Sequence, residues 1–142
     1  MNENPKIFIA TGGIIVAVFM IIYGAILPVL KAQAYINAAR SASSIRTIQD
    51  FESNFNKVFN FYSPIGGEES AKFLLSNILT VLNGQKDQPE NVTRKLIDYI
   101  EPKIYPDTRH YLAMANLYTV ALTRFRIEDD YKKAVEFYSL AR

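Results

Sequence analysis

Few side chains in this 142-residue chain could do chemistry. His110 is its only histidine, and the chain has no cysteine. A zinc site or a Ser-His-Asp triad needs several such groups at fixed spacings, so a single histidine gives either one almost nothing to build on. We therefore expect His110 to be a surface residue beside a buried neighbour, Tyr111. We expect no catalytic residue, no metal site and no cofactor.

Two clusters of carboxylates are the other candidates. Glu68 and Glu69 form the first, and Glu128, Asp129 and Asp130 form the second. Both could act in acid–base chemistry or hold a cation. Both also stand where a helix is expected to begin, and a carboxylate at a helix N-terminus is stabilised by the helix dipole. We therefore interpret both clusters as helix-start residues.

The helices that carry these residues follow a long apolar run. From Ile7 to Leu30 the sequence has no charged residue, and the run exceeds the roughly 20 residues that cross the hydrocarbon of a bilayer. It is longer than the apolar part of a signal peptide, and Lys31 marks its polar edge. We expect a single-pass transmembrane helix over residues 7–30, after an N-terminal tail of residues 1–6, with membrane lipid around it. Gly13 and Ala17 have the spacing of a small-residue pair that would allow self-association through this helix.

Charges around this run give a first indication of topology. Lys31, Arg40 and Arg46 follow the run before any acidic residue, and only Lys6 and the terminal amine precede it. The positive-inside rule then places the C-terminal region in the cytoplasm. The net charge of +2 is spread along the chain, without the basic stripe that binds a phosphate backbone, so we expect no nucleic acid partner.

The rest of the sequence predicts an all-α fold, because no segment alternates apolar and polar residues at the period of a strand. Residues 31–43 would be a helical extension of the span, and residues 44–142 would form the folded domain. We expect the helix that ends near Gly84 to have this glycine as a left-handed cap. The predicted inward positions are Ile45, Ile48, Phe51, Phe55, Val58 and Tyr62, then Ala71, Leu74, Leu75, Ile78 and Leu82, and then Leu96, Ile97 and Ile100.

The last part of the chain has a more specific pattern. Small residues at fixed positions let two helices of a hairpin approach closely, while aromatic residues fill the space beside the next helix. Two groups of residues have this spacing: Tyr111, Met114, Ala115 and Tyr118 in the first helix, and Ala134, Tyr138 and Ala141 in the second. On these repeat-packing residues, residues 108–142 resemble one tetratricopeptide repeat (TPR), although the gap between the two groups is longer than usual by about two helical turns. The resemblance implies antiparallel helical hairpins in a short α-solenoid; an ordinary amphipathic hairpin is the alternative.

A second resemblance concerns the order of short motifs. L-P-x-L-K-A ends the apolar run, and Y-I-N-A-A-R, S-P-x-G-x-E-E and Y-P-D-x-R-x-Y follow it. This order is similar to the C-terminal end of bacterial O-antigen ligase and polymerase membrane proteins, whose last spanning helix precedes an extracytoplasmic TPR-like region. The resemblance implies the plasma (inner) membrane and an extracytoplasmic domain, in disagreement with the positive-inside count. No catalytic residue of the ligase has a counterpart here.

We therefore expect a membrane-anchored TPR-like module for protein–protein interaction, associated with surface-glycan assembly, whose protein partner the sequence does not identify. One alternative is the C-terminal fragment of a polytopic O-antigen ligase or polymerase, because the sequence stops inside the predicted last helix. The other is a structural filament subunit that assembles through its apolar N-terminal helix.

Overall fold

The computed structural model describes residues 5–42, 45–85 and 87–142. All regular structure in these ranges is helical, which confirms the all-α prediction. The elements are α1 Pro5–Ile21, the π-helix η1 Ile22–Ile26, α2 Leu27–Ser41, α3 Ile48–Phe59, α4 Gly67–Gly84, α5 Glu90–Ile100, the 3₁₀-helix η3 Glu101–Lys103, α6 Thr108–Phe125 and α7 Glu128–Leu140. The predicted boundary between residues 43 and 44 lies outside the described residues, as do residues 1–4 of the predicted tail.

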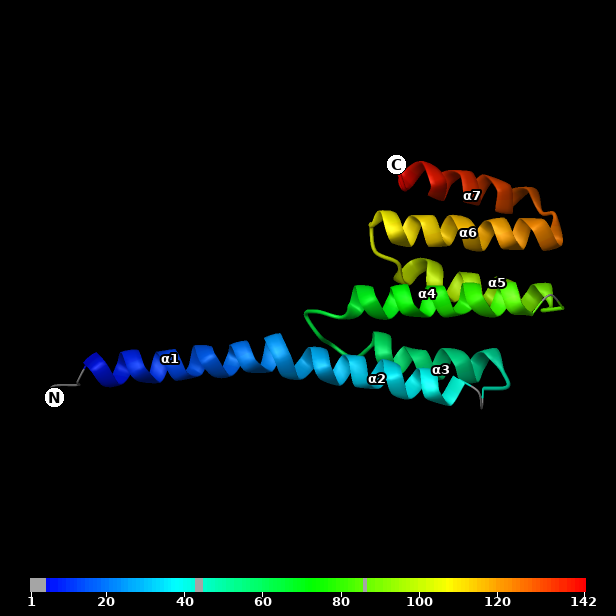
Figure 1. The fold of residues 1–142 in the computed structure, drawn as a ribbon. Helices are drawn as coiled ribbons and strands as arrows, with labels where there is room; N and C mark the ends of the chain where they lie inside the picture. Colours follow the sequence, from blue (N-terminus) through cyan, green and yellow to red (C-terminus); the bar gives the residue numbers. More distant parts are fainter. Residues whose placement is uncertain (1–4, 43–44, 86) are drawn as a thin grey trace.

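The first three elements form one continuous helix, and its α1 part extends away from the other helices (Figure 1). Its stretch Phe8–Ser41 is 34 residues long and is apolar enough to cross a membrane by length and composition, and its most apolar window is not buried. Pro5 and Lys6 belong to α1 rather than to a tail. Both predicted edges, Ile7 and Leu30, fall inside this one helix.

A π-turn interrupts the regular hydrogen bonding near the end of the apolar run. The Leu27 amide donates to the Ile22 carbonyl, five residues back. Pro28 follows, and a proline inside a helix has no amide hydrogen and clashes with the carbonyl four residues before it. A π-turn widens the helix locally, so the chain passes Pro28 without ending the helix.

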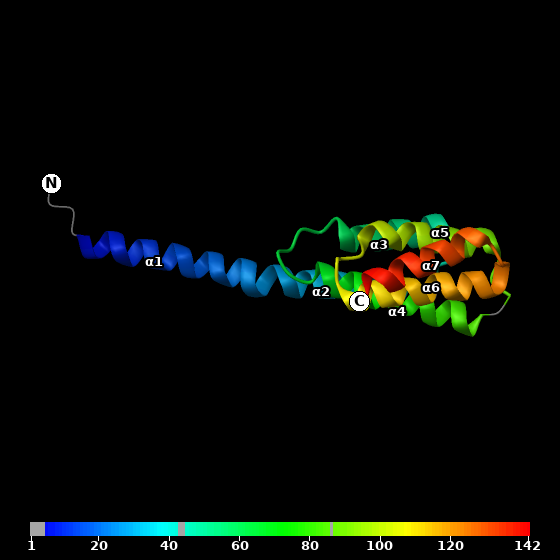
Figure 2. The same ribbon diagram turned by 90° about the horizontal axis from the view of Figure 1, so that it is seen from above.

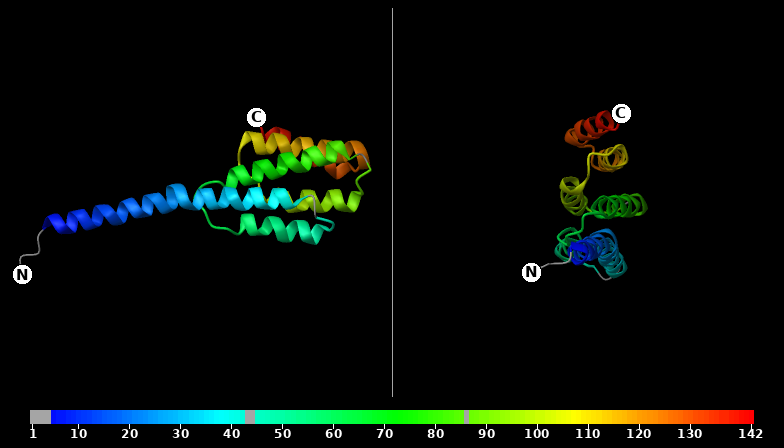
Figure 3. Two further views of the ribbon diagram at one scale, coloured as in Figure 1. Left: turned by 60° about the horizontal axis from the view of Figure 1, so that its bottom comes forward. Right: turned by 90° about the vertical axis from the view of Figure 1, so that its left-hand side faces the viewer.

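The helices from α2 onward lie in three pairs, α2 with α3, α4 with α5, and α6 with α7, and the two members of each pair run in opposite directions (Figure 1). The pairs are stacked so that α2, α4 and α6 lie on one side and α3, α5 and α7 on the other (Figures 2 and 3). Residues 31–41, predicted as an extension, are thus part of the first pair. Asn54 fixes this pairing by donating its amide to the Ala38 carbonyl at 2.9 Å.

The core follows the predicted helical stripes closely in the second pair. All eight inward positions predicted for α4 and α5 are buried: Ala71, Leu74, Leu75, Ile78, Leu82, Leu96, Ile97 and Ile100. In the first pair Phe55 and Val58 are buried, but Tyr62 is exposed because α3 ends at Phe59. These stripes remove apolar surface from water, which is the main favourable term in folding.

The left-handed backbone positions differ from the prediction. Gly84 is the last residue of α4, and among the described residues only Gly66 and Arg126 have positive φ, at 93° and 56°. Gly66 is the N-cap of α4, and Arg126 is the C-cap of α6. The sequence analysis was therefore wrong about a left-handed cap at Gly84, because Gln85 ends this helix in another conformation.

Candidate functional site

The first candidate site is the interface inside the last helix pair, where the repeat-packing residues were predicted. Met114, Ala115, Tyr118 and Ala134 are buried there. Tyr111 is half-buried, and its ring lies 6.2 Å from the Phe137 ring.

The two remaining predicted residues lie elsewhere. Tyr138 is exposed and donates its hydroxyl to the Asn116 side chain at 2.8 Å, and Ala141 is the C-cap of α7. Phe137 takes the inward position and stacks on Tyr118, with ring centroids 5.8 Å apart. Phe137 is three residues after Ala134, so the same helical spacing that selected Tyr138 also allows Phe137.

A buried ion pair sets this register of α7. Asp130 is buried, four residues before Ala134 on the same stripe. Its carboxylate accepts hydrogen bonds from both terminal nitrogens of Arg94 on α5, and one of these bonds is 2.6 Å long. The hydrogen bonds from Arg94 to this carboxylate raise the pKa of the Arg94 guanidinium. Asp130 is therefore more than a helix-start residue, because it joins α7 to α5.

A second polar contact joins the same two pairs. The Glu101 carboxylate accepts the Tyr118 hydroxyl at 2.6 Å and the Lys133 ammonium at 3.0 Å. Burial raises the pKa of Tyr118, and the hydrogen bond to Glu101 adds to the shift. Both contacts pair polar groups of the second helix pair with polar groups of the third, so they hold the two pairs together.

The second candidate site surrounds His110, which the sequence analysis wrongly placed at the surface. His110 is only 1% exposed, and neither of its ring nitrogens has a hydrogen-bond partner among the described residues. The Tyr105 ring lies beside it, with ring centroids 6.1 Å apart. The Tyr105 hydroxyl lies against Gly67 at the start of α4, so closely that a Cβ atom at position 67 would overlap it. An unpaired buried polar group costs about 1–3 kcal/mol, so this burial needs an explanation.

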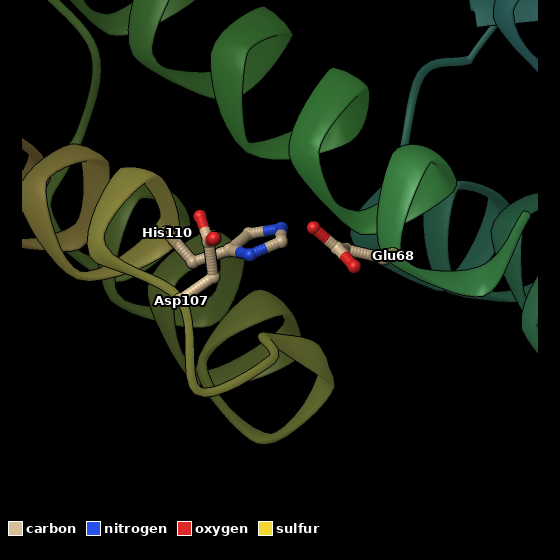
Figure 4. A group of neighbouring side chains, drawn as sticks. All are labelled: Glu68, Asp107 and His110. Carbon is tan, nitrogen blue, oxygen red and sulfur yellow. The ribbon is translucent and has the colours of Figure 1, made fainter.

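Two carboxylates approach His110 from two different helix starts. Figure 4 shows the imidazole ring pointing from α6 toward Glu68 at the start of α4, with Asp107 beside the ring. One ligand atom from each of the three residues lies within 4.8 Å of the other two. Asp107 is the N-cap of α6 and accepts the Arg109 amide at 2.8 Å.

Arg109 links the two carboxylates on the solvent side. Its guanidinium lies 3.1 Å from the Glu68 carboxylate and 3.0 Å from the Asp107 carboxylate. The hydrogen bonds from Arg109 lower the pKa of Asp107 below its ordinary value. Both carboxylates reach solvent at the rim of the site, while the buried imidazole lies at its floor.

The third candidate site is an apolar groove of about 570 Å³ between the first two helix pairs. It lies at the C-terminal ends of α2 and α4, which point away from α1. Arg46, Thr47, Asn77 and Gln85 contribute polar groups to its lining. Its apolar lining includes Ile45, Ile48, Phe51, Phe55, Ile78 and Val81.

Comparisons with protein-family models, with curated protein sequences and with solved structures gave no significant match. The functional argument therefore depends on the geometry of this chain alone.

Proposed function

We propose that this chain is a single-pass membrane protein whose TPR-like stack of helix pairs binds another protein next to the bilayer. The observation that carries the proposal is the apolar groove between the first two pairs. Ligand sites in proteins are concave and mostly apolar, with a few polar groups that fix orientation. The groove has this character, with aromatic and aliphatic side chains below and Arg46 and Gln85 at its edge.

The occupant that fits this groove is an apolar face of a partner helix or peptide. Helices bind grooves by inserting side chains at spacings of three and four residues. Three observations support a TPR-like stack: the pairing of consecutive helices, the two layers, and small residues such as Ala115 and Ala134 between α6 and α7. Stacks of helical repeats bind their partners on extended concave surfaces.

Site-specific photo-crosslinking in native membranes tests the proposal. Val81 is exposed and lines the groove, whereas Phe73 is exposed on the same helix and is not among the groove's lining residues. We expect p-benzoylphenylalanine at position 81 to capture one defined protein, and the same residue at position 73 not to capture it. Val81→Glu should then abolish co-purification of that protein, while Phe73→Glu should not. Equal capture at both positions would contradict binding in the groove.

The membrane side is proposed to be extracytoplasmic, next to a glycan assembly system in the plasma membrane. An epitope tag after Arg142 and protease treatment of intact spheroplasts test this side. Digestion from outside would support the extracytoplasmic proposal. Protection until lysis would mean that Lys31, Arg40 and Arg46 set the topology, and the glycan-assembly proposal would fail.

A further inference from the structure

We infer that Glu68, Asp107 and His110 form a binding site for a divalent transition metal ion, which joins the second helix pair to the third. This inference is independent of the proposed protein partner. The sequence offered no support for a metal site, because one histidine was considered without the carboxylates that the fold brings to it.

The histidine is the first reason. A buried imidazole without any hydrogen-bond partner is rare, because buried polar side chains are almost always paired. Both ring nitrogens of His110 are buried and have no partner within the described ranges, and the ring points toward the Glu68 carboxylate (Figure 4). A bound cation would provide the missing partner for one ring nitrogen.

The ligand geometry is the second reason. Ligand atoms at about 2.1 Å from a tetrahedral ion lie about 3.4 Å from one another. Here the three ligand atoms lie within 4.8 Å of one another, so rotations of the two partly exposed carboxylate side chains would bring the ligand atoms to this spacing. A three-ligand site leaves the fourth position to water or to a ligand.

The charge of the site and its access from solvent are the third reason, because both favour a cation. The Glu68 side chain is 39% exposed and the Asp107 side chain 32%, so an ion can reach the site from solvent. Arg109 neutralises part of their charge, but its own side chain is 61% exposed. It can turn into water when a cation replaces it between the carboxylates. Zn²⁺ suits a mixed set of one imidazole and two carboxylates, since it accepts both nitrogen and oxygen ligands.

Calorimetric titration with Zn²⁺ on the full chain in detergent micelles tests the site, with an affinity tag that contains no histidine. We expect one Zn²⁺ per chain. Loss of a partner outside the ligand shell weakens metal affinity about 10- to 100-fold, so we expect about 100-fold or more for Glu68→Gln, Asp107→Asn and His110→Gln. Asparagine keeps the N-cap of α6, so this variant leaves the helix start in place.

Glu69→Gln is the matched control, because it removes the same charge from the exposed neighbour of Glu68. It should leave the affinity unchanged. Co²⁺ absorption and X-ray absorption should report one imidazole ligand that His110→Gln removes. Absence of stoichiometric binding would overturn the inference, and so would an equal loss of affinity in Glu68→Gln and Glu69→Gln. Far-UV circular dichroism of each variant shows whether the helices are intact.

Discussion

The Arg94–Asp130 pair predicts an unequal cost for removing its two members. Arg94→Ala leaves the Asp130 carboxylate, whose side chain is only 2% exposed, without its partner. Asp130→Ala leaves the Arg94 guanidinium, which is 26% exposed and also lies 3.6 Å from Glu90. The arginine can therefore find water and a second carboxylate, whereas the aspartate cannot.

The expected free energies of unfolding follow from this difference in exposure. Removing one partner of a buried pair costs about 3–5 kcal/mol, because an uncompensated charge stays buried. We expect Arg94→Ala to lose this amount. We expect Asp130→Ala to lose only about 1–2 kcal/mol, the cost of a lost charged hydrogen bond to a group that stays hydrated. The double variant should be more stable than Arg94→Ala alone, since the one carboxylate that loses its partner, Glu90, is 50% exposed and stays hydrated.

Urea unfolding of the full chain in micelles, monitored by far-UV circular dichroism, measures these free energies of unfolding. The comparison requires that the m-value, the slope of the free energy against urea concentration, is the same in all variants. Lys132→Ala is the control on α7, because the ion pairs of Lys132 in the described part of the chain are with the exposed Glu128 and Asp129. It should change stability by less than about 1 kcal/mol. If Asp130→Ala costs as much as Arg94→Ala, or if the double variant is the least stable, the argument from burial is refuted.

Three further predictions concern single positions. Leu82→Ala should cost about 2–5 kcal/mol in urea unfolding, because Leu82 is fully buried between packed helices; a cost below about 1 kcal/mol would contradict its place in the core. Gly66→Ala should destabilise by about 1–2 kcal/mol, because its φ of 93° is unfavourable for alanine, whereas Gly84→Ala, in a helix with open space around it, should stabilise by up to about 1 kcal/mol. Burial raises the pKa of Tyr118 in the folded chain, so the unfolded chain loses this proton first as the pH rises. The free energy of unfolding should therefore fall above a pH of about 10, by up to about 1.4 kcal/mol per pH unit. Tyr118→Phe should reduce this alkaline slope in thermal unfolding, with a remainder from Tyr99, whose pKa burial also raises; the exposed Tyr131→Phe should leave the slope unchanged.

Apolar periodicity was enough to predict the core of the second helix pair. The eight inward positions predicted in α4 and α5 are aliphatic or alanine, so residue type and helical spacing point to the same face. Ser70, Thr93 and Tyr99 are buried in these helices as well, and the prediction missed them. The limit of this method appears where a polar residue occupies an inward position. His110 lies four residues before Met114 and seven before Leu117, and all three are buried. Spacing alone would have placed it inward, but its residue type led to a surface assignment.

Asp130 shows the same limit on α7. It precedes Ala134 by four residues and Phe137 by seven, and it can be buried only because Arg94 reaches it from α5. This partner is 36 residues away in the sequence. The meeting of Glu68 with His110 likewise depends on how the pairs stack. Neither contact follows from the pattern of a single helix.

The contact between Lys31 and the loop after α3 has a mechanical consequence. Lys31 is buried and donates its ammonium to the Phe61 carbonyl at 2.9 Å. The apolar helix enters the folded domain there without any intervening linker, so the domain cannot swivel on a flexible tether. A stretch of 34 helical residues is about 51 Å long. Under the proposed function, a load applied by the bound partner would therefore pass directly into this helix and change its tilt in the lipid.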